Sequence, residues 1–312
     1  MIQADLTPAL RIENLRHSFG QTEALKDLSF NVPAGQLFAL LGPNGSGKST
    51  LFRLISTLAP VQAGSISVFG FDVARQQSQV RRKIGVIFQN PALDKQLTVM
   101  ENLACHASLY GLGTAAWRPR AEVLLERFDL LARSGKIINT FSGGMRRKVE
   151  LVKALLTEPA MLILDEPSTG LDLPSRLEMW KLLDQARQRS GLTVIVTTHL
   201  MDEADRCDGV AIIDRGRLLK IGSPAELKRE IGGDVITFSG PDTEQLKTMV
   251  EQKLRVKVKQ VNQSLRLERE HAHQFVPHLI EAVPGMIDSV SVGRPTLDDV
   301  FIHHTGRHIT GP

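Results

Sequence analysis

The sequence predicts an α/β protein with a core of parallel strands, an antiparallel sheet beside it, an inserted set of helices and a small C-terminal α+β domain. The core prediction comes from three short apolar runs: LFALLG at 37–42, MLILDEP at 161–167 and TVIVTTH at 193–199. Each run has the length and composition of a buried strand, and the runs alternate with segments of helical periodicity. This alternation is typical of α/β folds with a parallel sheet.

The predicted antiparallel sheet comes from three segments in which apolar and polar residues alternate. These are ALRIENLRHSF at 9–19, ALKDLSFNV at 24–32 and GSISVFGFDV at 64–73. Alternation with period two predicts strands that are buried on one face only. Between about 97 and 157 the periodicity becomes helical, so we expect an inserted helical subdomain over about 91–157.

A second domain is expected after the diglycine at 232–233, which divides the chain into 1–232 and 233–312. The second part has the element order βαββαβ, which is the split βαβ arrangement of a small ferredoxin-like domain. A last helix is expected with Thr296 as its N-cap and Leu297, Val300, Phe301 and His304 on one stripe. This helix could dock on its own domain or contact a second subunit.

Composition limits the classes of protein that the chain can represent. The hydrophobic fraction of 42% can supply a core, and the net charge of +4 is spread along the chain. The two cysteines are far apart, which argues against a disulfide framework or a zinc site. The sequence has no run of eighteen apolar residues and no leader pattern, so we expect a cytoplasmic protein. The basic triplets at 81–83 and 146–148 could contact phosphates or an acidic membrane face, but such triplets are more often solvated helix faces, and we interpret them so.

The segment GPNGSGKST at 42–50 matches the phosphate-binding loop (P-loop) pattern G-x-x-x-x-G-K-[ST]. It leaves a predicted buried strand and opens a helix, so its backbone N–H groups can converge on phosphates. Lys48 would neutralise phosphate charge, and the Ser49 hydroxyl would ligate Mg²⁺. The alternative is a glycine-rich turn with an exposed lysine. The candidate nucleotide-binding residues are Gly42, Pro43, Asn44, Gly45, Ser46, Gly47, Lys48, Ser49 and Thr50.

Polar residues at three other strand ends complete a candidate catalytic site. Asp165 at the end of MLIL would hold the magnesium shell, and the adjacent Glu166 would polarise the attacking water. Without a P-loop upstream, this acidic pair would more often be a cap or a salt-bridge partner. His199 is either a γ-phosphate contact or a hydrogen-bonded structural residue. Gln89, after the strand-like KIGVIF, is either a magnesium and water ligand or a polar strand terminus.

The segment FSGGMRRKVEL at 141–151 offers a second anion-binding turn. Ser142, Gly143 and Gly144 precede a predicted helix, so their N–H groups and one hydroxyl could bind a γ-phosphate at its positive end. The P-loop already surrounds one face of the triphosphate. In a head-to-tail dimer, each subunit would donate its serine and glycines to ATP on its partner's P-loop, so both turns would bind phosphate.

The ordered set GPNGSGKST, Gln89, FSGGM, LILDEP, STGLD and His199 resembles the nucleotide-binding subunits of ABC transporters over about residues 10–230. The resemblance implies a P-loop NTPase fold, ATP and Mg²⁺ as ligands, and ATP hydrolysis. It also implies that Phe19 stacks on adenine, although a half-buried strand phenylalanine is the alternative. It assigns Asp172 to the loop that communicates across the dimer. Met145 replaces the glutamine usual in the signature motif and leaves the serine and glycine donors intact.

Within this superfamily, the signature, the segment FQNPALDKQLTVMENL and the tail PTLDDVFIHHTG are similar to the daunorubicin-resistance and nodulation type of subunit. That resemblance implies a homodimer or heterodimer at the inner face of the cell membrane, which powers export through a separate ABC-2 type permease. The cargo cannot be inferred, because it would contact the permease.

Two other classes of ABC protein are alternatives. A soluble ATPase acting on nucleic acid or the ribosome is suggested by the pI near 9.1. The chain has only one P-loop, a short interval between Ser49 and Ser142, and no zinc-module cysteines, so nucleic acid is not expected as a partner. A non-catalytic ATP sensor is disfavoured because the candidate catalytic residues are present.

Overall fold

The computed structural model describes residues 7–309, so the first six residues of the N-terminal segment and the last three of the chain lie outside the described part. Contacts divide the chain into two compact units. The first comprises Met1–Thr198 with Ile213–Leu218, and the second comprises His199–Ile212 with Leu219–Pro312. No helix of the described residues is both long and apolar enough to span a bilayer.

The first unit contains a parallel sheet of apolar strands. Its strands β3 (Leu37–Leu41), β8 (Thr193–Thr198), β7 (Met161–Asp165) and β6 (Ile84–Ile87) lie in the order β3-β8-β7-β6. All three pairings are parallel. Nearly every residue of these strands is buried, as expected when both faces of a parallel sheet are covered. The prediction of a parallel α/β core is confirmed.

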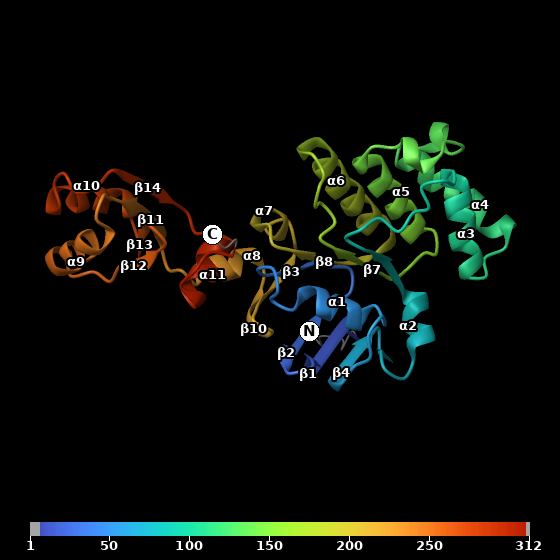
Figure 1. Ribbon diagram of the computed structural model, residues 1–312, viewed down its shortest axis with the longest axis horizontal. Helices are drawn as coiled ribbons and strands as arrows, with labels where there is room; N and C mark the ends of the chain where they lie inside the picture. The colour runs from blue at the N-terminus through green and yellow to red at the C-terminus, as the bar shows by residue number, and fades with distance from the viewer. Residues whose placement is uncertain (1–6, 310–312) are drawn as a thin grey trace, which may run out of the picture. The chain divides into compact units, whose positions relative to one another are not determined.

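An antiparallel sheet accompanies the parallel one within this unit. Its strands β1 (Leu10–Phe19), β2 (Thr22–Val32), β4 (Ala63–Val68) and β5 (Phe71–Asp72) lie in the order β2-β1-β4-β5. Buried and exposed residues alternate along much of β1 and β2, because one face of the sheet is covered. The predicted antiparallel sheet is therefore present (Figure 1).

Helices account for the rest of the first unit. Helix α1 (Lys48–Ile55) follows β3, and α2 (Gln77–Lys83) precedes β6. Helices α3 (Val99–Leu109), α4 (Thr114–Arg127) and α5 (Gly143–Leu155) pack on one another, as Figure 1 shows. Two 3₁₀ turns, η1 (Leu131–Arg133) and η2 (Ile138–Thr140), join α4 to α5. Helix α6 (Leu173–Ser190) lies between β7 and β8 in the chain. The limits of about 91–157 for a helical subdomain stay a prediction.

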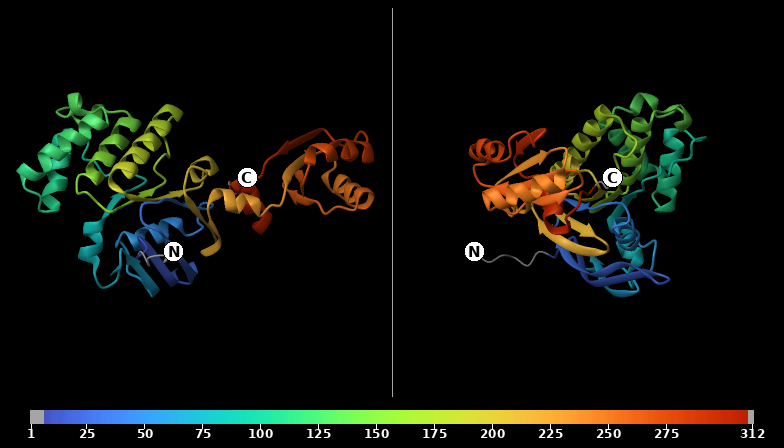
Figure 2. Two further views of the ribbon diagram at one scale, coloured as in Figure 1. Left: turned by 180° about the vertical axis from the view of Figure 1, so that it is seen from behind. Right: turned by 60° about the vertical axis from the view of Figure 1, so that its left-hand side comes forward.

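The second unit ends in a four-stranded antiparallel sheet. Strands β11 (Asp234–Ser239), β12 (Lys259–Val261), β13 (Ser264–Arg269) and β14 (Ser289–Gly293) lie in the order β12-β13-β11-β14. Helices α9 (Thr243–Leu254) and α10 (Ala272–Ala282) contribute to the core of this sheet (Figure 2, orange to red). The observed order is βαββαβ, while assignment to the ferredoxin-like class stays a prediction.

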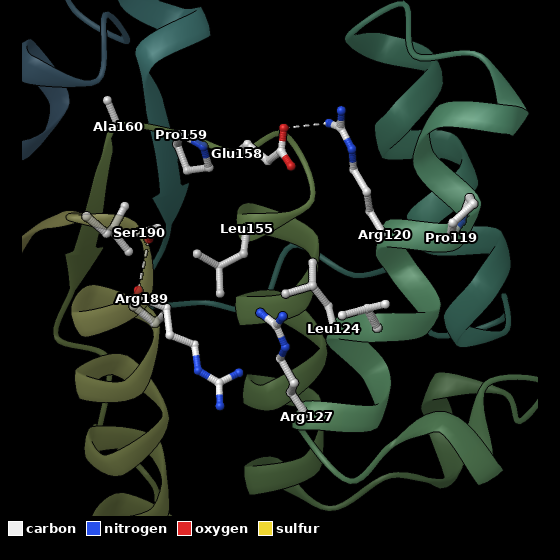
Figure 3. Close-up of a pocket in the computed structure, with 13 residues that line it drawn as sticks. Pro119, Arg120, Leu124, Arg127, Leu155, Glu158, Pro159, Ala160, Arg189 and Ser190 are labelled. Atoms are coloured by element: carbon white, nitrogen blue, oxygen red, sulfur yellow. Dashed lines mark hydrogen bonds and ion pairs between the residues drawn. The ribbon is translucent and has the colours of Figure 1, made fainter.

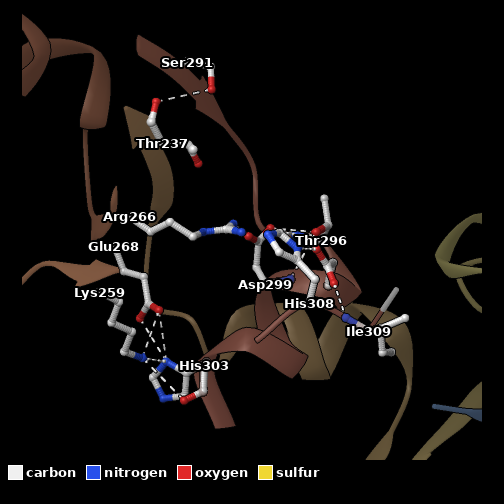
Figure 4. Close-up of polar contacts among 11 residues, drawn as sticks. Thr237, Lys259, Arg266, Glu268, Ser291, Thr296, Asp299, His303, His308 and Ile309 are labelled. Atoms are coloured by element: carbon white, nitrogen blue, oxygen red, sulfur yellow. Dashed lines mark hydrogen bonds and ion pairs between the residues drawn. The ribbon is translucent and has the colours of Figure 1, made fainter. Parts of the chain in front are cut away.

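The last helix, α11 (Leu297–Thr305), is tied to other parts of the second unit. Thr296 forms a capping box with Asp299, as its predicted N-cap role requires. Asp299 pairs with Arg266, and Nδ1 of His303 lies within hydrogen-bond distance of Glu268 Oε2, at 3.0 Å, as Figure 4 shows. These contacts favour docking on the helix's own chain, the first of the two alternatives above.

Three short elements that precede the diglycine at 232–233 belong wholly or mostly to the second unit. They are α7 (Met201–Ala204), α8 (Pro224–Arg229) and most of β10 (Arg217–Gly222), while β9 (Gly209–Asp214) is divided between the units. Helix α11 packs against both α7 and α8, which explains this grouping. The domain boundary at 232/233 stays a prediction.

The core of the C-terminal sheet provides a test of this architecture. Phe238 is fully buried among the apolar residues that β11, β13, α9 and α10 supply. We expect Phe238→Ala to lower the free energy of unfolding by about 3–5 kcal/mol, because the substitution leaves a cavity. The matched change Val292→Ala, on the partly exposed strand β14, should cost less than about 1 kcal/mol. Calorimetry and urea denaturation of the full chain measure both, and equal losses would contradict the assigned core.

Candidate functional site

The P-loop joins β3 to α1 in a conformation that requires glycine. Gly47 has φ of +108°, and a Cβ there would come within 2.8 Å of the Ala24 carbonyl oxygen. A Cβ on Gly45 would face open space, so the loop is exposed at the point where a ligand would approach. The N–H of Gly216 donates to the Ser46 carbonyl at 2.9 Å and holds the loop from behind. The positive end of α1 therefore faces an accessible backbone cradle.

Lys48 is buried inside this cradle. Its Nζ donates to the carbonyl oxygens of Gly42 at 2.6 Å and Pro43 at 2.9 Å. Burial lowers the pKa of Lys48, while the charges of Glu166 and Asp165 raise it. The alternative of a glycine-rich turn with an exposed lysine is therefore wrong, because only 4% of the lysine surface is accessible.

Ser46 supplies an observation on what the loop could hold. Its Oγ is buried and has no hydrogen-bond partner among the described residues. An unpaired buried hydroxyl is costly, and an acceptor oxygen within reach would remove that cost. Together with the ammonium of Lys48 and the backbone N–H groups, the loop suits a polyphosphate. The neighbouring Asn44 and Ser49 are exposed and can reach such a ligand.

Two of the three residues predicted to ligate magnesium, Asp165 and Ser49, lie together. Burial raises the pKa of Asp165, against the opposing hydrogen bonds that it accepts from Thr197 and Ser49. The hydroxyl of Thr197 on β8 donates to Asp165 Oδ1 at 2.5 Å. The pairing of β7 with β8 brings this donor into place. The carboxylate of Asp165 and the hydroxyl of Ser49 thus form a pair of hard oxygen donors beside Lys48.

Glu166 is held by its backbone at the end of β7. Its φ is +43°, which is unusual for a residue with a side chain and costs free energy. Its N–H donates to the Thr197 carbonyl oxygen at 3.1 Å. Its carboxylate accepts from Gln89 Nε2 at 3.4 Å and from Thr169 Oγ1 at 3.3 Å. The structure therefore joins two of the three predicted catalytic residues directly.

The remaining candidates occupy distinct positions. His199 directly follows β8, whose last carbonyl, on Thr198, accepts the N–H of Gly42 at 3.3 Å. Phe19 ends β1 and is 54% exposed, so its ring is accessible, and its stacking on adenine stays a prediction. The ring of His17 packs edge-on against it at 4.8 Å between centroids.

Asp172 is the N-cap of α6. Its carboxylate accepts the N–H of Ser175 at 3.1 Å, and hydrogen bonds from Ser175 lower its pKa. No hydrogen bond or ion pair within the described residues joins it to the P-loop.

The second glycine turn begins α5. Ser142 accepts the N–H of Met145 at 3.3 Å and so caps the helix. Gly143 is exposed, and a Cβ on Gly144 would clash with Ser175 at 2.5 Å. Within the described part of the chain, no hydrogen bond or ion pair joins this turn to residues 42–50. The structure thus presents two separate anion-binding turns on one chain.

The interpretation of the triplet 146–148 as a solvated helix face is wrong. Arg147 is buried and donates to the carbonyl oxygens of Phe88 at 2.9 Å and Gln89 at 3.2 Å. It also pairs with Glu150 at 2.8 Å. Lys148 pairs with Glu178 of α6 at 2.6 Å. The sequence carried one usable signal, because Glu150 stands three residues after Arg147, at the spacing of an ion pair on a helix.

A separate cavity of about 690 Å³ lies between α4, the end of α5 and the end of α6, as Figure 3 shows. Leu124 and Leu155 form part of its wall, and Arg120 pairs with Glu158 at its rim at 2.9 Å. None of the predicted site residues lines it. The cavity is therefore distinct from the P-loop site.

Comparison with known proteins agrees with this geometry. A family model described as "ABC transporter" matches residues 25–169. A second, described as "ATP-binding protein DrrA1-3-like, C-terminal domain", matches residues 222–305. A solved structure of an "ATP binding subunit of ABC transporter" has a TM-score of 0.65 and 32% identity, and the match covers 72% of this chain and 93% of that one.

Curated relatives extend over nearly the whole chain. The daunorubicin resistance ATP-binding protein DrrA3 of Streptomyces coeruleorubidus is 38% identical, with 96% of each chain covered. The Nod factor export ATP-binding protein I of Ralstonia nicotianae is 36% identical, with 97% of this chain and 95% of that one covered. These matches do not favour the alternative of an ATPase acting on nucleic acid or the ribosome. The chain belongs to the ABC transporter family as an ATP-binding and ATP-hydrolysing subunit, of the same type as the daunorubicin resistance and Nod factor export ATP-binding proteins.

Proposed function

We propose that this ATPase is the motor subunit of an exporter and works at the inner face of the cell membrane. The observation that carries the proposal is the convergence of Lys48, Ser49, Asp165, Glu166 and Gln89 at the carboxyl ends of neighbouring parallel strands. In open α/β sheets, ligands bind at these strand ends. The names of the relatives support export as the purpose of the ATP hydrolysis.

On binding ATP, the P-loop would replace hydrogen bonds within the loop by hydrogen bonds to phosphate oxygens. Lys48 would release the carbonyl oxygens of Gly42 and Pro43 for phosphate oxygens, and the Ser46 hydroxyl would gain an acceptor. The remaining loop residues, Asn44 to Thr50, would supply N–H donors. Phe19, exposed at the end of β1, would stack on the adenine.

Hydrolysis requires a cation and a positioned water. Mg²⁺ would be held by Ser49, Asp165 and Gln89, and its charge would stabilise the phosphate oxygens. Glu166 would take a proton from water as the water oxygen attacks the γ-phosphorus and the bond to the bridging oxygen breaks. Gln89, which donates to Glu166, would orient that carboxylate, and His199 would contact the γ-phosphate.

The second glycine turn, at residues 142–144, supports a dimer in which two copies of the chain or two related subunits face head to tail. Ser142 and Gly143 are exposed and Gly144 is partly exposed at the N-terminus of a thirteen-residue helix. In a head-to-tail pair these residues would bind the γ-phosphate on the partner's P-loop, with Asp172 near the shared boundary. ATP would hold the pair closed, and hydrolysis would release it.

A groove beside the Gln89 segment is the proposed dock for an ABC-2 type permease. This cavity of about 290 Å³ is lined by Phe88, Ala92 and the partly exposed Leu58 and Tyr110. Burial lowers the pKa of its His106 to about 4, so that imidazole is neutral at physiological pH. A mainly apolar groove of this kind suits a short helix of a membrane protein.

Asp165→Asn separates metal binding from folding. Burial raises the pKa of Asp165, so at pH 7 the ionised carboxylate destabilises the ligand-free fold. At pH 7 we expect the neutral amide to leave the free energy of unfolding unchanged or to raise it. The difference in this free energy between variant and parent should shrink as the pH falls through the raised pKa of Asp165. Mg²⁺-dependent ATP hydrolysis should fall by about 100-fold or more. Urea unfolding at pH 7 and pH 5 and a phosphate-release assay measure the two effects, and a less stable variant at pH 7 would contradict the assigned burial cost.

Glu166→Gln tests the base. The amide keeps an oxygen for Gln89 and Thr169 but cannot take a proton, so ATP binding should persist while turnover falls by about 100-fold or more. Equilibrium binding of a fluorescent ATP analogue and single-turnover hydrolysis report the two properties. Glu122→Gln, at an exposed position of α4, is the control and should retain full turnover. Hydrolysis at the normal rate in Glu166→Gln would remove this residue from the role of base.

Ser142→Arg tests the dimer. The large cation fills the second turn without touching the P-loop of its own chain, so ATP binding should stay within about threefold of the parent. Dimer formation with ATP, measured by light scattering in a Glu166→Gln background, should be lost, and hydrolysis with it. Ser190→Arg at the far end of α6 is the control. An active, dimerising Ser142→Arg protein would mean that the turn only starts a helix.

A further inference from the structure

Three charged residues of α5 form one stripe: Arg147, Glu150 and Lys153, hereafter the α5 stripe. Their spacing of three residues places them on one side of the helix. Arg147 and Glu150 have only 5% and 2% of their side-chain surface exposed. Lys153 is half-buried and lines the groove proposed for the permease. Charges on the buried side of a helix are unusual, and each of these has a partner.

The α5 stripe holds the backbone of residues 88–92 at four points. Arg147 donates to the carbonyl oxygens of Phe88 and Gln89. Glu150 Oε1 accepts the N–H of Ala92 at 2.8 Å, and Lys153 Nζ donates to the carbonyl oxygen of the same residue. The segment that carries Gln89 is therefore fastened on both sides of that residue to one helix, about sixty residues away in the chain.

The stripe is not explained by stability alone. Burial lowers the pKa values of Arg147 and Lys153 and raises that of Glu150, so each charge is held at a desolvation cost that its partners offset. Apolar side chains of similar volume often stabilise a protein as well as a buried ion pair does. What they cannot do is fix the direction of backbone carbonyls, which the planar guanidinium of Arg147 does. The charges of the α5 stripe therefore serve to orient the backbone groups of residues 88–92.

We propose that the α5 stripe positions Gln89 for its contact with Glu166 by fixing the backbone on both sides of Gln89. The inference rests on the proposed role of Gln89 and adds the residues that hold it in place. The stripe residues are positioning residues and touch no nucleotide.

A double substitution separates positioning from folding. Arg147→Met alone would leave the Glu150 carboxylate buried and unpaired, which destabilises the protein. Arg147→Met combined with Glu150→Leu removes both charges and keeps the volume. The matched control is Arg118→Met with Glu122→Leu, which removes an exposed arginine–glutamate pair on α4. Arg147→Lys keeps a charge beside Glu150 but loses the planar fork.

We expect the double variant to unfold cooperatively and to keep KM for ATP within about threefold, while kcat falls about tenfold or more because Gln89 is misplaced. Hydrogen exchange of the Ala92 amide should become faster. Arg147→Lys should have an intermediate kcat, and the control pair should match the parent. Adding Gln89→Ala to the double variant should lower kcat little further, because both changes act through one residue.

The outcomes separate this inference from the proposed function. If Gln89→Ala lowers kcat but the double variant does not, or if the two losses multiply, the stripe does not position Gln89 and the inference is wrong. If Gln89→Ala itself leaves kcat unchanged, the assigned role of Gln89 fails, and the inference fails with it. A loss of kcat with an unchanged Ala92 exchange rate would also overturn the stated mechanism, because the fastening of residues 88–92 would be intact.

Discussion

The parallel pairing of β3, β8, β7 and β6 is the constraint on which the site depends. Parallel strands end at the same edge, so Asp165 and Thr197 meet the P-loop, although the P-loop precedes both by more than a hundred residues. The apolar interiors of these strands bury the sheet and leave polar groups only where the strands end. Hydrophobic burial therefore stabilises the sheet, and the common direction of its strands places the polar residues of the site at one edge.

The charged side chains at this edge of the parallel sheet lose solvation on burial, which costs free energy. Burial disfavours the charged forms of both Lys48 and Asp165, and their attraction for each other offsets part of that cost. Glu166 adds backbone strain, and Ser46 adds an unpaired buried hydroxyl. Strained and underpaired groups collect at sites prepared for a ligand. A polyphosphate with its cation supplies the charges and acceptors that these groups lack.

The buried pair of Arg147 and Glu150 shows a different use of charge. These side chains do not face the P-loop; they orient backbone carbonyls and an N–H in the segment around Gln89. A network in which every member is paired can specify one arrangement of the chain more sharply than apolar packing does. In this protein the network joins a catalytic segment to the helix that begins at the signature turn.

Local sequence patterns alone predicted the parallel and antiparallel strands, the P-loop, the capped last helix and the candidate catalytic residues, because periodicity and glycine-rich loops are short-range signals. They did not show that Gln89 contacts Glu166 or that Thr197 bonds Asp165, since strand order is a long-range property. Arg147 was misjudged for the same reason: a basic triplet has the same pattern whether it faces water or a buried segment. Only the tertiary structure placed residues 88–92 beside α5 and so decided which of the three cations is buried.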